Sequence, residues 1–373
     1  MRSPRLEEWF DWGVEVISEQ GAFDRDNSDI LVSIVNYRSA EHCLSCLTSM
    51  LAEKEHIPGL QVVIADGASG DDSLDQLQSW ISANRRGDWI SVLPLSINGG
   101  FGWAHNQVML RSFRSDSPPA FIHLLNPDTR LEPGAISALR EVFDSAPRIA
   151  CAGSQLINES GGLQPAGFHL PNIRTELARG GRATRIARAL GAPDPVILPT
   201  GSLQVVPAVS GASFMVRMSA LHEVGLFDHG FFLYFEEFEW MHRFARHGWK
   251  IVHEPRSRVH HIGGASTKLS RDSKVLARAP RPFYWYQSQR RCLYRLHGPF
   301  RARLAALAWL VGYVLIALPR AAVSRGFRSN RVKNEGPDML RAWLTNERFD
   351  RQAFIPLPGD TIDQPPAWQT RRK

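Results

Sequence analysis

Residues 30–51, read ILVSIVNYRSAEHCLSCLTSML, set the pattern that decides the fold of this chain. The opening run, ILVSIVNY, is apolar and has the length of a β-strand. The remainder begins near Ser39, a residue type favoured at helix N-termini, and repeats its apolar residues at helical spacing. We therefore expect a strand followed by a helix.

The same alternation continues to about residue 145. Strand-like runs alternate with helical segments at residues 60–66, 74–83, 89–95, 103–113, 120–125 and 133–145. Strands alternating with helices at these lengths predict right-handed crossovers and an open, doubly wound α/β sheet. Ligands of such sheets bind beyond the carboxyl ends of the strands, so the loops that follow the strands are the candidate site.

The chain has 373 residues and a formal net charge of +7, spread unevenly. Arginines crowd residues 174–188 and the part after Lys268, which indicates an anionic partner such as phosphate, a membrane surface or nucleic acid. Residues 155–208 are rich in Gly, Pro and Arg and are expected to form a loop-rich insertion.

The four cysteines do not form a disulfide framework for a chain of this length, and the N-terminal residues lack an apolar signal core. Both features predict a cytoplasmic location. Cys43 and Cys46 form a C-x-x-C pair without a second pair at zinc spacing, so we expect them to lie on a helix.

The C-terminal region carries an uncharged apolar segment, residues 304–319, flanked by Arg303 and Arg320. As a helix it would reach roughly 24 Å, which is short of the roughly 30 Å hydrocarbon core of a bilayer. The arginines, with nearby Trp and Tyr residues, are typical of lipid interfaces. We expect a monotopic or re-entrant membrane element, with a buried helix packed on the catalytic domain as the alternative.

Two loops after strands carry carboxylates that could bind a nucleotide. Asp128, in LLNPDTRL (residues 124–131), could hold a hard cation on a diphosphate, although an Asx turn before the helix at Pro133 is the alternative. Asp66, before a Gly-rich turn, could accept hydrogen bonds from a base or ribose, although Asp-Gly is also an ordinary turn. Residues 98–106, NGGFGWAHN, lack the G-x-G-x-x-G spacing of a dinucleotide site.

The stretch LYFEEFEW, residues 233–240, sets several carboxylates among aromatic residues. A carboxylate beside apolar walls suits a general base, and a solvated helix start is the alternative. Consecutive helical residues point about 100° apart, so Glu236 and Glu237 cannot share one role. Glu239 is expected to pair with Arg243 one helical turn later.

Seven blocks in order along residues 29–266 resemble the inverting family 2 glycosyltransferases of the GT-A fold, and most of all their rhamnosyltransferase branch. The blocks read VSIVNYR, VVIADGASGDDS, NGGFGWAHN, LLNPDTRL, GASFMVRMSALHEVGLFD, FLYFEEFEWMHRFARHGWKIV and VHHIGGAST. The resemblance implies a Rossmann-like, mostly parallel sheet flanked by helices. It gives a catalytic domain at residues 29–267, an N-terminal extension at 1–28 and a basic, helical, membrane-associating region at 268–373.

The resemblance also assigns roles to residues. Glu237 stands where the family has its general base, and Asn126 stands at the first Asp of the family's D-x-D motif, which leaves Asp128 as the ligand for Mg²⁺ or Mn²⁺. The remaining matches are the base-binding Asp66, the nucleotide-sugar pocket residues Asn98 and Asn106, and His261 at the diphosphate or metal. Beyond these matches, Ser266 and Thr267 could contact phosphate, and Arg271 or Lys268 could neutralise the leaving group.

The implied reaction moves a sugar from a nucleotide-diphosphate donor to a hydroxyl group of a saccharide carried on a polyprenyl diphosphate. The donor expected from the resemblance is dTDP-rhamnose, with a UDP-sugar or GDP-sugar as alternatives. The enzyme would act in cell-surface polysaccharide synthesis, at the inner face of the cell membrane. A non-catalytic nucleotide-sugar-binding scaffold is the second interpretation. Nucleic acid is not expected as a partner, because an apolar run lies among the arginines.

Overall fold

The computed structural model describes residues 30–182, 189, 191, 194–263, 280–329, 332–345 and 348–372. The strands of its main sheet are β1 (Ile30–Asn36), β2 (Gln61–Asp66), β3 (Ile90–Pro94), β4 (Phe121–Leu125), β5 (Thr129–Leu131), β6 (Ile149–Ile157), β9 (Gln204–Val205), β10 (Ser213–Arg217) and β11 (Lys250–His261). A separate pair is formed by β7 (Gly167–Phe168) and β8 (Val196–Ile197).

The main sheet has nine strands in the order β3-β2-β1-β4-β10-β6-β11-β5, with β9 paired to β11. β1 is parallel to β2 and β4, β2 is parallel to β3, and β6 is parallel to β11. β10 runs antiparallel between β4 and β6, and β5 and β9 run antiparallel to β11. The carboxyl ends of β1 to β4, β6 and β11 therefore lie at one edge, as expected for a mostly parallel, Rossmann-like sheet.

The helices before the C-terminal region are α1 (Ala40–Ser49), α2 (Leu51–His56), α3 (Ser73–Ala83), α4 (Phe101–Ser112), α5 (Ala135–Ser145), α6 (Ile173–Gly181), α8 (Met218–Val224) and α9 (Glu236–Arg246). Two hydrophobic clusters show that α1, α3 and α5 cover one face of the sheet and α4, α8 and α9 cover the other. β1 is buried on both faces, with Ile34 in the first cluster and Leu31 in the second. Its apolar run is therefore explained by a central position.

Several local expectations can be compared with this fold. Cys43 and Cys46 are buried on α1, as expected of a helical pair. β11 is one long strand with a register shift between Glu254 and Arg258. The doubly wound pattern is interrupted by β10, because the chain reaches this strand through the 155–208 insertion and not through a helical crossover.

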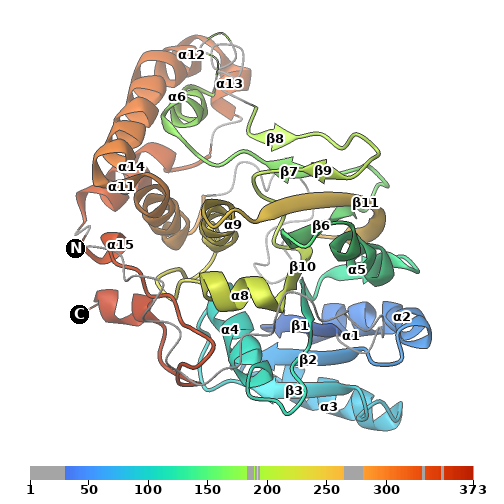
Figure 1. Cartoon of the computed structure of the whole chain (residues 1–373). Coiled ribbons are helices and arrows are strands. Elements are labelled where there is room, and N and C mark those ends of the chain that lie inside the picture. The colour runs from blue at the N-terminus through green and yellow to red at the C-terminus, as the bar shows by residue number, and fades with distance from the viewer. Residues whose placement is uncertain are drawn as a thin grey trace.

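The C-terminal region is helical, as expected: α11 (Phe283–Gly312), a π-helical turn (Tyr313–Ala317), α12 (Leu318–Val323), α13 (Arg325–Ser329), α14 (Glu335–Leu344), α15 (Arg348–Arg351) and a 3₁₀ turn (Ala367–Arg372). These helices gather with α6 on the side of the molecule away from α1, α2 and α3 (Figure 1). Gly298, with φ 74°, divides α11 into a segment before the bend and a segment after it.

The segment of α11 before the bend is tied to the sheet domain by buried charges. The Arg291 guanidinium lies 2.7 Å from the Asp228 carboxylate, and neither side chain is exposed. Arg291 also donates to the carbonyl oxygens of Phe349 and Gln352, so this one side chain joins α11, the segment before α9 and the chain around α15. The C-terminal region is therefore packed on the catalytic fold.

The segment of α11 after the bend packs closely on α6. A β-carbon at Gly180 would lie 2.0 Å from the carbonyl oxygen of Trp309, and one at Gly312 would lie 2.2 Å from that of Leu177. Only glycine allows the two backbones to approach this closely. By length and composition alone, residues Phe283–Val323 could cross a membrane. Only 22% of the most apolar window of this segment is buried, whereas the core helix of a soluble protein would be mostly buried.

Replacing Arg291 with Leu should lower the free energy of unfolding by about 3–5 kcal/mol, because it removes the closest cation from the buried Asp228 carboxylate and leaves only Arg295 at 3.4 Å. The matched control is Arg148→Leu, which removes a half-exposed pair with Glu223 and should cost about 1 kcal/mol or less. Urea unfolding of both variants measures the difference. Equal midpoints for the two variants would contradict the structural role given to Arg291.

Candidate active site

The loops after β1 and β2 are joined by a buried polar network around Asp66. The Asp66 carboxylate accepts hydrogen bonds from the Asn36 side chain at 2.8 Å, and from the hydroxyl and backbone N–H of Ser69 at 2.6 and 3.1 Å. Register pairs Asn36 with Asp66, so both stand at the carboxyl ends of their strands. Asp66 is thus held rigidly at the edge where a ligand of this sheet would bind.

Asn98 stands in the loop after β3, beside this network. Its side-chain oxygen accepts from the Gly100 backbone N–H at 3.1 Å and would lie 3.9 Å from a β-carbon placed on Gly67. Gly100 has φ 88°, and its Cα closely approaches the backbone of Phe232. The glycines of this loop therefore let it pack against the chain that leads to α9.

Asn106 lies on α4 and is fully buried. Both polar ends of its side chain bond to the backbone of Phe227, at 2.8 Å to the carbonyl oxygen and 3.0 Å from the N–H. These bonds join α4 to the loop between α8 and α9, so Asn106 holds that loop in place.

Asp128 and His261 come together from distant parts of the sequence. His261, the last residue of β11, pairs in register with Thr129 of β5, and its Nε2 lies 3.5 Å from Asp128 Oδ1. The Ile262 N–H donates to the Asp128 carbonyl oxygen at 3.2 Å. Asn126, two residues before Asp128, donates its backbone N–H to the carbonyl oxygen of Ala212 at 2.9 Å.

A carboxylate beside an imidazole at this edge suits a divalent cation that also binds a diphosphate, because phosphate oxygens complete the coordination. Within the described ranges, no group of three or more His, Cys, Asp or Glu side chains is placed to hold a metal by itself. Asp128 and His261 therefore fit a cation that a bound diphosphate also coordinates. The other expected phosphate contacts, Ser266, Thr267, Lys268 and Arg271, lie outside the described residues.

Glu236 and Glu237 begin α9 after a turn with unusual backbone geometry. Tyr234 and Phe235 both adopt left-handed conformations, with φ 72° and 70°. Glu236 is buried and Glu237 is partly buried, and the Oε2 atom of each is buried without a hydrogen-bond partner among the residues described. Glu239 pairs with Arg243 at 2.9 Å, as its spacing predicted.

The surroundings of the Glu236 and Glu237 carboxyl groups raise the pKa of both. Burial raises the pKa of Glu237 to about 7, against hydrogen bonds from the backbone N–H groups of Glu237 and Phe235, which lower it. Burial, and then the Glu237 charge, raise the pKa of Glu236 well above its ordinary value. The Glu237 carboxyl therefore titrates close to neutral pH, in the range in which a general base works.

The short loop at Gly211 and Ala212 lies between Glu237 and the loop that carries Asn126 and Asp128. A β-carbon on Gly211 would lie 3.7 Å from Glu237 Oε1 and 3.8 Å from the ring of Phe101, while Ala212 accepts the hydrogen bond from Asn126. The structure thus brings together, at one edge of the sheet, the predicted residues Asp66, Asn98, Asn126, Asp128, His261 and Glu237.

Two residues that support this region were not predicted from the sequence. Arg38, with φ 53°, donates through Nε to the Ser69 carbonyl oxygen at 2.7 Å and so locks the β1 and β2 loops together. Trp368 donates through its indole N–H to the Gly99 carbonyl oxygen at 3.0 Å and packs edge-on against Phe232. Trp368 belongs to the C-terminal region, so its partners are far away in the sequence. A motif search cannot indicate such a contact.

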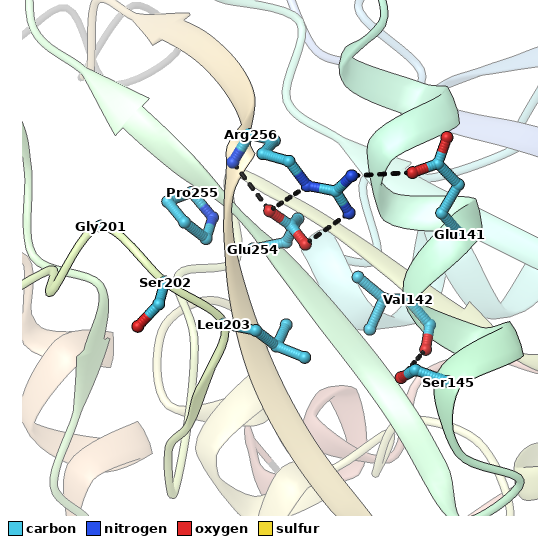
Figure 2. Close-up of a pocket in the computed structure, with 9 residues that line it drawn as sticks. All are labelled: Glu141, Val142, Ser145, Gly201, Ser202, Leu203, Glu254, Pro255 and Arg256. Atoms are coloured by element: carbon cyan, nitrogen blue, oxygen red, sulfur yellow. Dashed lines mark hydrogen bonds and ion pairs between the residues drawn. The ribbon is translucent and has the colours of Figure 1, made fainter.

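A separate cavity of about 240 Å³ lies between α5 and β11, lined by Glu141, Val142, Ser145, Gly201, Ser202, Leu203, Glu254, Pro255 and Arg256 (Figure 2). The Arg256 guanidinium binds the carboxylates of Glu141 and Glu254 there, at 2.8 and 3.0 Å. None of the predicted site residues lines this cavity. Its main charges are already paired with each other, so we do not place the chemistry here.

Comparisons with known proteins identify relatives of this chain. A family model described as glycosyltransferase-like family 2 matches residues 27–278. The chain is 28% identical, over 64% of its length and 78% of the relative's, to N-acetylglucosaminyl-diphospho-decaprenol L-rhamnosyltransferase of Mycobacterium tuberculosis.

Solved structures are also similar to this chain. A mannosyltransferase from Pyrobaculum calidifontis in complex with GDP-Man and Mn²⁺ has a TM-score of 0.49 and 13% identity, with 92% of each chain covered. GalNAc-T7 with UDP, GalNAc and Mn²⁺ has a TM-score of 0.46 and 16% identity, over 62% of this chain and 42% of that one.

Proposed function

We propose a function from the premise that this chain belongs to glycosyltransferase family 2, whose model matches well over half of it. The chain is thus a transferase, and the resemblance seen in its sequence is confirmed. We propose that it is an inverting enzyme that moves a sugar from a nucleotide-diphosphate donor to a hydroxyl group of a lipid-linked saccharide. Glu237, partly buried at the ligand edge of the sheet with its pKa near 7, is the observation that carries this proposal.

In this mechanism Glu237 takes the proton from the acceptor hydroxyl as its oxygen attacks the anomeric carbon. The leaving nucleoside diphosphate departs from the opposite face of that carbon, so the configuration inverts. A β-carbon on Gly211 would contact both Glu237 Oε1 and the Phe101 ring, so part of the surroundings of the Glu237 carboxylate is apolar. A partly desolvated carboxylate is a stronger base than a solvated one, so it accepts the proton readily close to neutral pH.

The donor would lie along the carboxyl ends of β1, β2 and β4. Asp66 would accept hydrogen bonds from the base, and Asn98 would line the pocket beside it. Asp128 and His261 would hold Mg²⁺ or Mn²⁺, and Asn126 would lie beside the diphosphate. When bound, the cation neutralises the charge that develops on the leaving diphosphate. Asn106 acts only by holding the Phe227 loop behind the site.

The relative that carries a rhamnosyltransferase name supports L-rhamnose as the transferred sugar and a diphospho-polyprenol saccharide as the acceptor. The resemblance in the sequence adds dTDP as the nucleotide of the proposed donor. UDP-sugars and GDP-sugars remain the alternative donors. A second function, a non-catalytic nucleotide-sugar-binding scaffold, would keep the donor site and lose the role of Glu237. The unpaired, buried Oε2 of Glu237 favours catalysis, because a scaffold gains nothing from an unsatisfied buried carboxylate.

A stripe of exposed apolar side chains supports membrane association of the region 268–373. The stripe runs along one face of the helix from α11 to α12, at spacings of three and four residues, and consists of Phe300, Leu304, Leu307, Val311, Val314, Leu315 and Leu318. The opposite face, with Ala302 and Ala305, is buried against the protein. One apolar face along a helix suits binding in the plane of the interface. Catalysis by domain 29–267 would then occur at the cytoplasmic face of the membrane.

Replacing Glu237 with Gln should lower kcat by roughly 10²- to 10⁴-fold, the usual contribution of a general base. Transfer would be measured from a panel of nucleotide sugars to a short-chain polyprenyl-diphosphate N-acetylglucosamine, with and without Mg²⁺ or Mn²⁺. In the wild type, kcat should rise with pH through about 7, because Glu237 acts in its ionised form.

The neighbouring substitution Glu236→Gln is the comparison, because glutamine resembles the protonated acid expected at that position. It should stay within roughly tenfold of the wild type if Glu237 alone is the base. Equal losses of kcat in Glu236→Gln and Glu237→Gln would contradict the assignment of Glu237 as the base. Donor binding without transfer to any acceptor would favour the scaffold.

Replacing Leu307 and Leu315 with Asp should weaken binding to phosphatidylglycerol-containing vesicles by tenfold or more, because a carboxylate in a membrane costs about 2.5–3.5 kcal/mol. Vesicle sedimentation measures the bound fraction. Leu198→Asp, at a site 71% exposed and outside the stripe, is the control and should change nothing. Unchanged sedimentation of the double variant would contradict the membrane assignment.

A further inference from the structure

The turn before the proposed base is under backbone strain. Tyr234 and Phe235 are consecutive non-glycine residues in the left-handed region, at φ 72° and 70°. Each such residue costs roughly 1–2 kcal/mol, so the turn persists only where its surroundings hold it. Residues in strained backbone of this kind often lie at functional sites, and here the next two residues are Glu236 and Glu237.

One short part of α11 contacts every residue of this turn. The Ser288 hydroxyl donates to the Leu233 carbonyl oxygen at 2.9 Å. The Tyr284 ring stacks on that of Tyr234, with centroids 6.2 Å apart, and the Trp285 ring packs edge-on against Phe235 at 5.1 Å. The aromatic contacts support the side chains, and the Ser288 bond holds the backbone itself.

α11 is in turn fixed to the chain on both sides of the turn. Arg291 pairs with Asp228 before it at 2.7 Å, and Arg295 lies 3.5 Å from Glu239 after it. These contacts set the distance between α11 and the start of α9. The Ser288 hydroxyl therefore has a fixed base from which to hold the Leu233 carbonyl.

We propose that Ser288 is a positioning residue for Glu237, acting through the Leu233 carbonyl to keep the left-handed turn that aims the Glu237 carboxylate at its substrate. This inference rests on the proposed function, because it takes Glu237 as the base. The link to the carboxylate is short, since the turn runs directly into Glu236 and Glu237 at the start of α9, and the Phe235 backbone N–H is one of the groups that lower the pKa of Glu237. If the turn relaxed, Glu237 would lose that donor.

The ionisable groups around Glu237 decide which residues contribute to a titration near neutral pH. Glu236 and Tyr234 come from its own segment and Cys292 comes from α11, while α4 and the Gly211 loop present Phe101 and glycine. Burial raises the pKa of Glu236 and Cys292 well above their ordinary values and that of Tyr234 to about 12. Cys292 and Tyr234 therefore stay neutral near pH 7, and a titration there belongs to the neighbouring pair Glu236 and Glu237. The Glu237→Gln variant identifies the part that is due to Glu237.

The test compares full-length wild type with Ser288→Ala, Ser288→Thr and the control Ser145→Ala. Ser145 also donates its hydroxyl to a backbone carbonyl, that of Val142 at 2.6 Å, but it lies beside the separate cavity (Figure 2). Steady-state transfer from dTDP-rhamnose gives kcat, the donor KM and the pH profile for each protein.

Ser288→Ala should lower kcat roughly tenfold to a hundredfold, because a misplacement of about 1 Å can cost this much. The donor KM should stay unchanged, and the acid limb of the kcat profile should move to higher pH, since loss of the Phe235 donor favours the protonated form. Ser288→Thr, which keeps the hydroxyl, should recover most of kcat. A kcat and pH profile equal to those of Ser145→Ala would overturn the proposal.

A second readout separates this inference from the proposed function. Carbon-13 NMR of labelled glutamate carboxyl groups, with Glu237→Gln to assign the signal, follows the Glu237 titration without any turnover. If wild type transfers nothing, the proposed function fails, yet an upward shift of this titration in Ser288→Ala still supports the positioning role. An identical titration in both proteins overturns it, whatever the activity.

Discussion

The buried ion pair between Arg291 and Asp228 is the interaction on which the arrangement of the whole active site depends. Two charges without solvent exposure are stable only while both partners remain in place. Because one partner lies on α11 and the other lies just before the catalytic turn, the pair makes the C-terminal region part of the catalytic fold. A tail added only for membrane attachment would not need such a contact.

This constraint gives α11 two roles along its length. Before the bend at Gly298, it supports the turn that leads to Glu237, and after the bend it packs on α6 and presents the apolar stripe. An acceptor held at a lipid surface would then meet a base whose position is set by the same helix. The same helix therefore joins the exposed apolar stripe to the turn that leads to Glu237.

Much of the fold could be predicted from the sequence because it rests on local patterns. The apolar run of β1 and the helical spacing of α1 follow from burial on a central strand, and Asp66 and Asp128 stand at strand ends as the alternation implied. His261 beside Asp128 was predicted only by the family resemblance, since β5 and β11 pair across a long stretch of chain.

What the sequence did not predict depends on contacts between distant segments. Asn106 belongs to a matching motif, yet the packing of α4 against the Phe227 loop directs its side chain into the core. Ser288 and Arg291 carry no local pattern that marks them, because their partners lie in the turn before α9. The antiparallel direction of β10 likewise follows from the path of an irregular insertion.

In the proposed reaction, Glu237 activates the acceptor while the diphosphate departs from the opposite face in a single displacement. The most direct measurement is the anomeric configuration of the new linkage, read from one-bond carbon–proton couplings of the purified product and compared with the donor. The account predicts inversion. A product that retains the configuration of the donor would contradict it, because retention requires a route other than one attack assisted by Glu237.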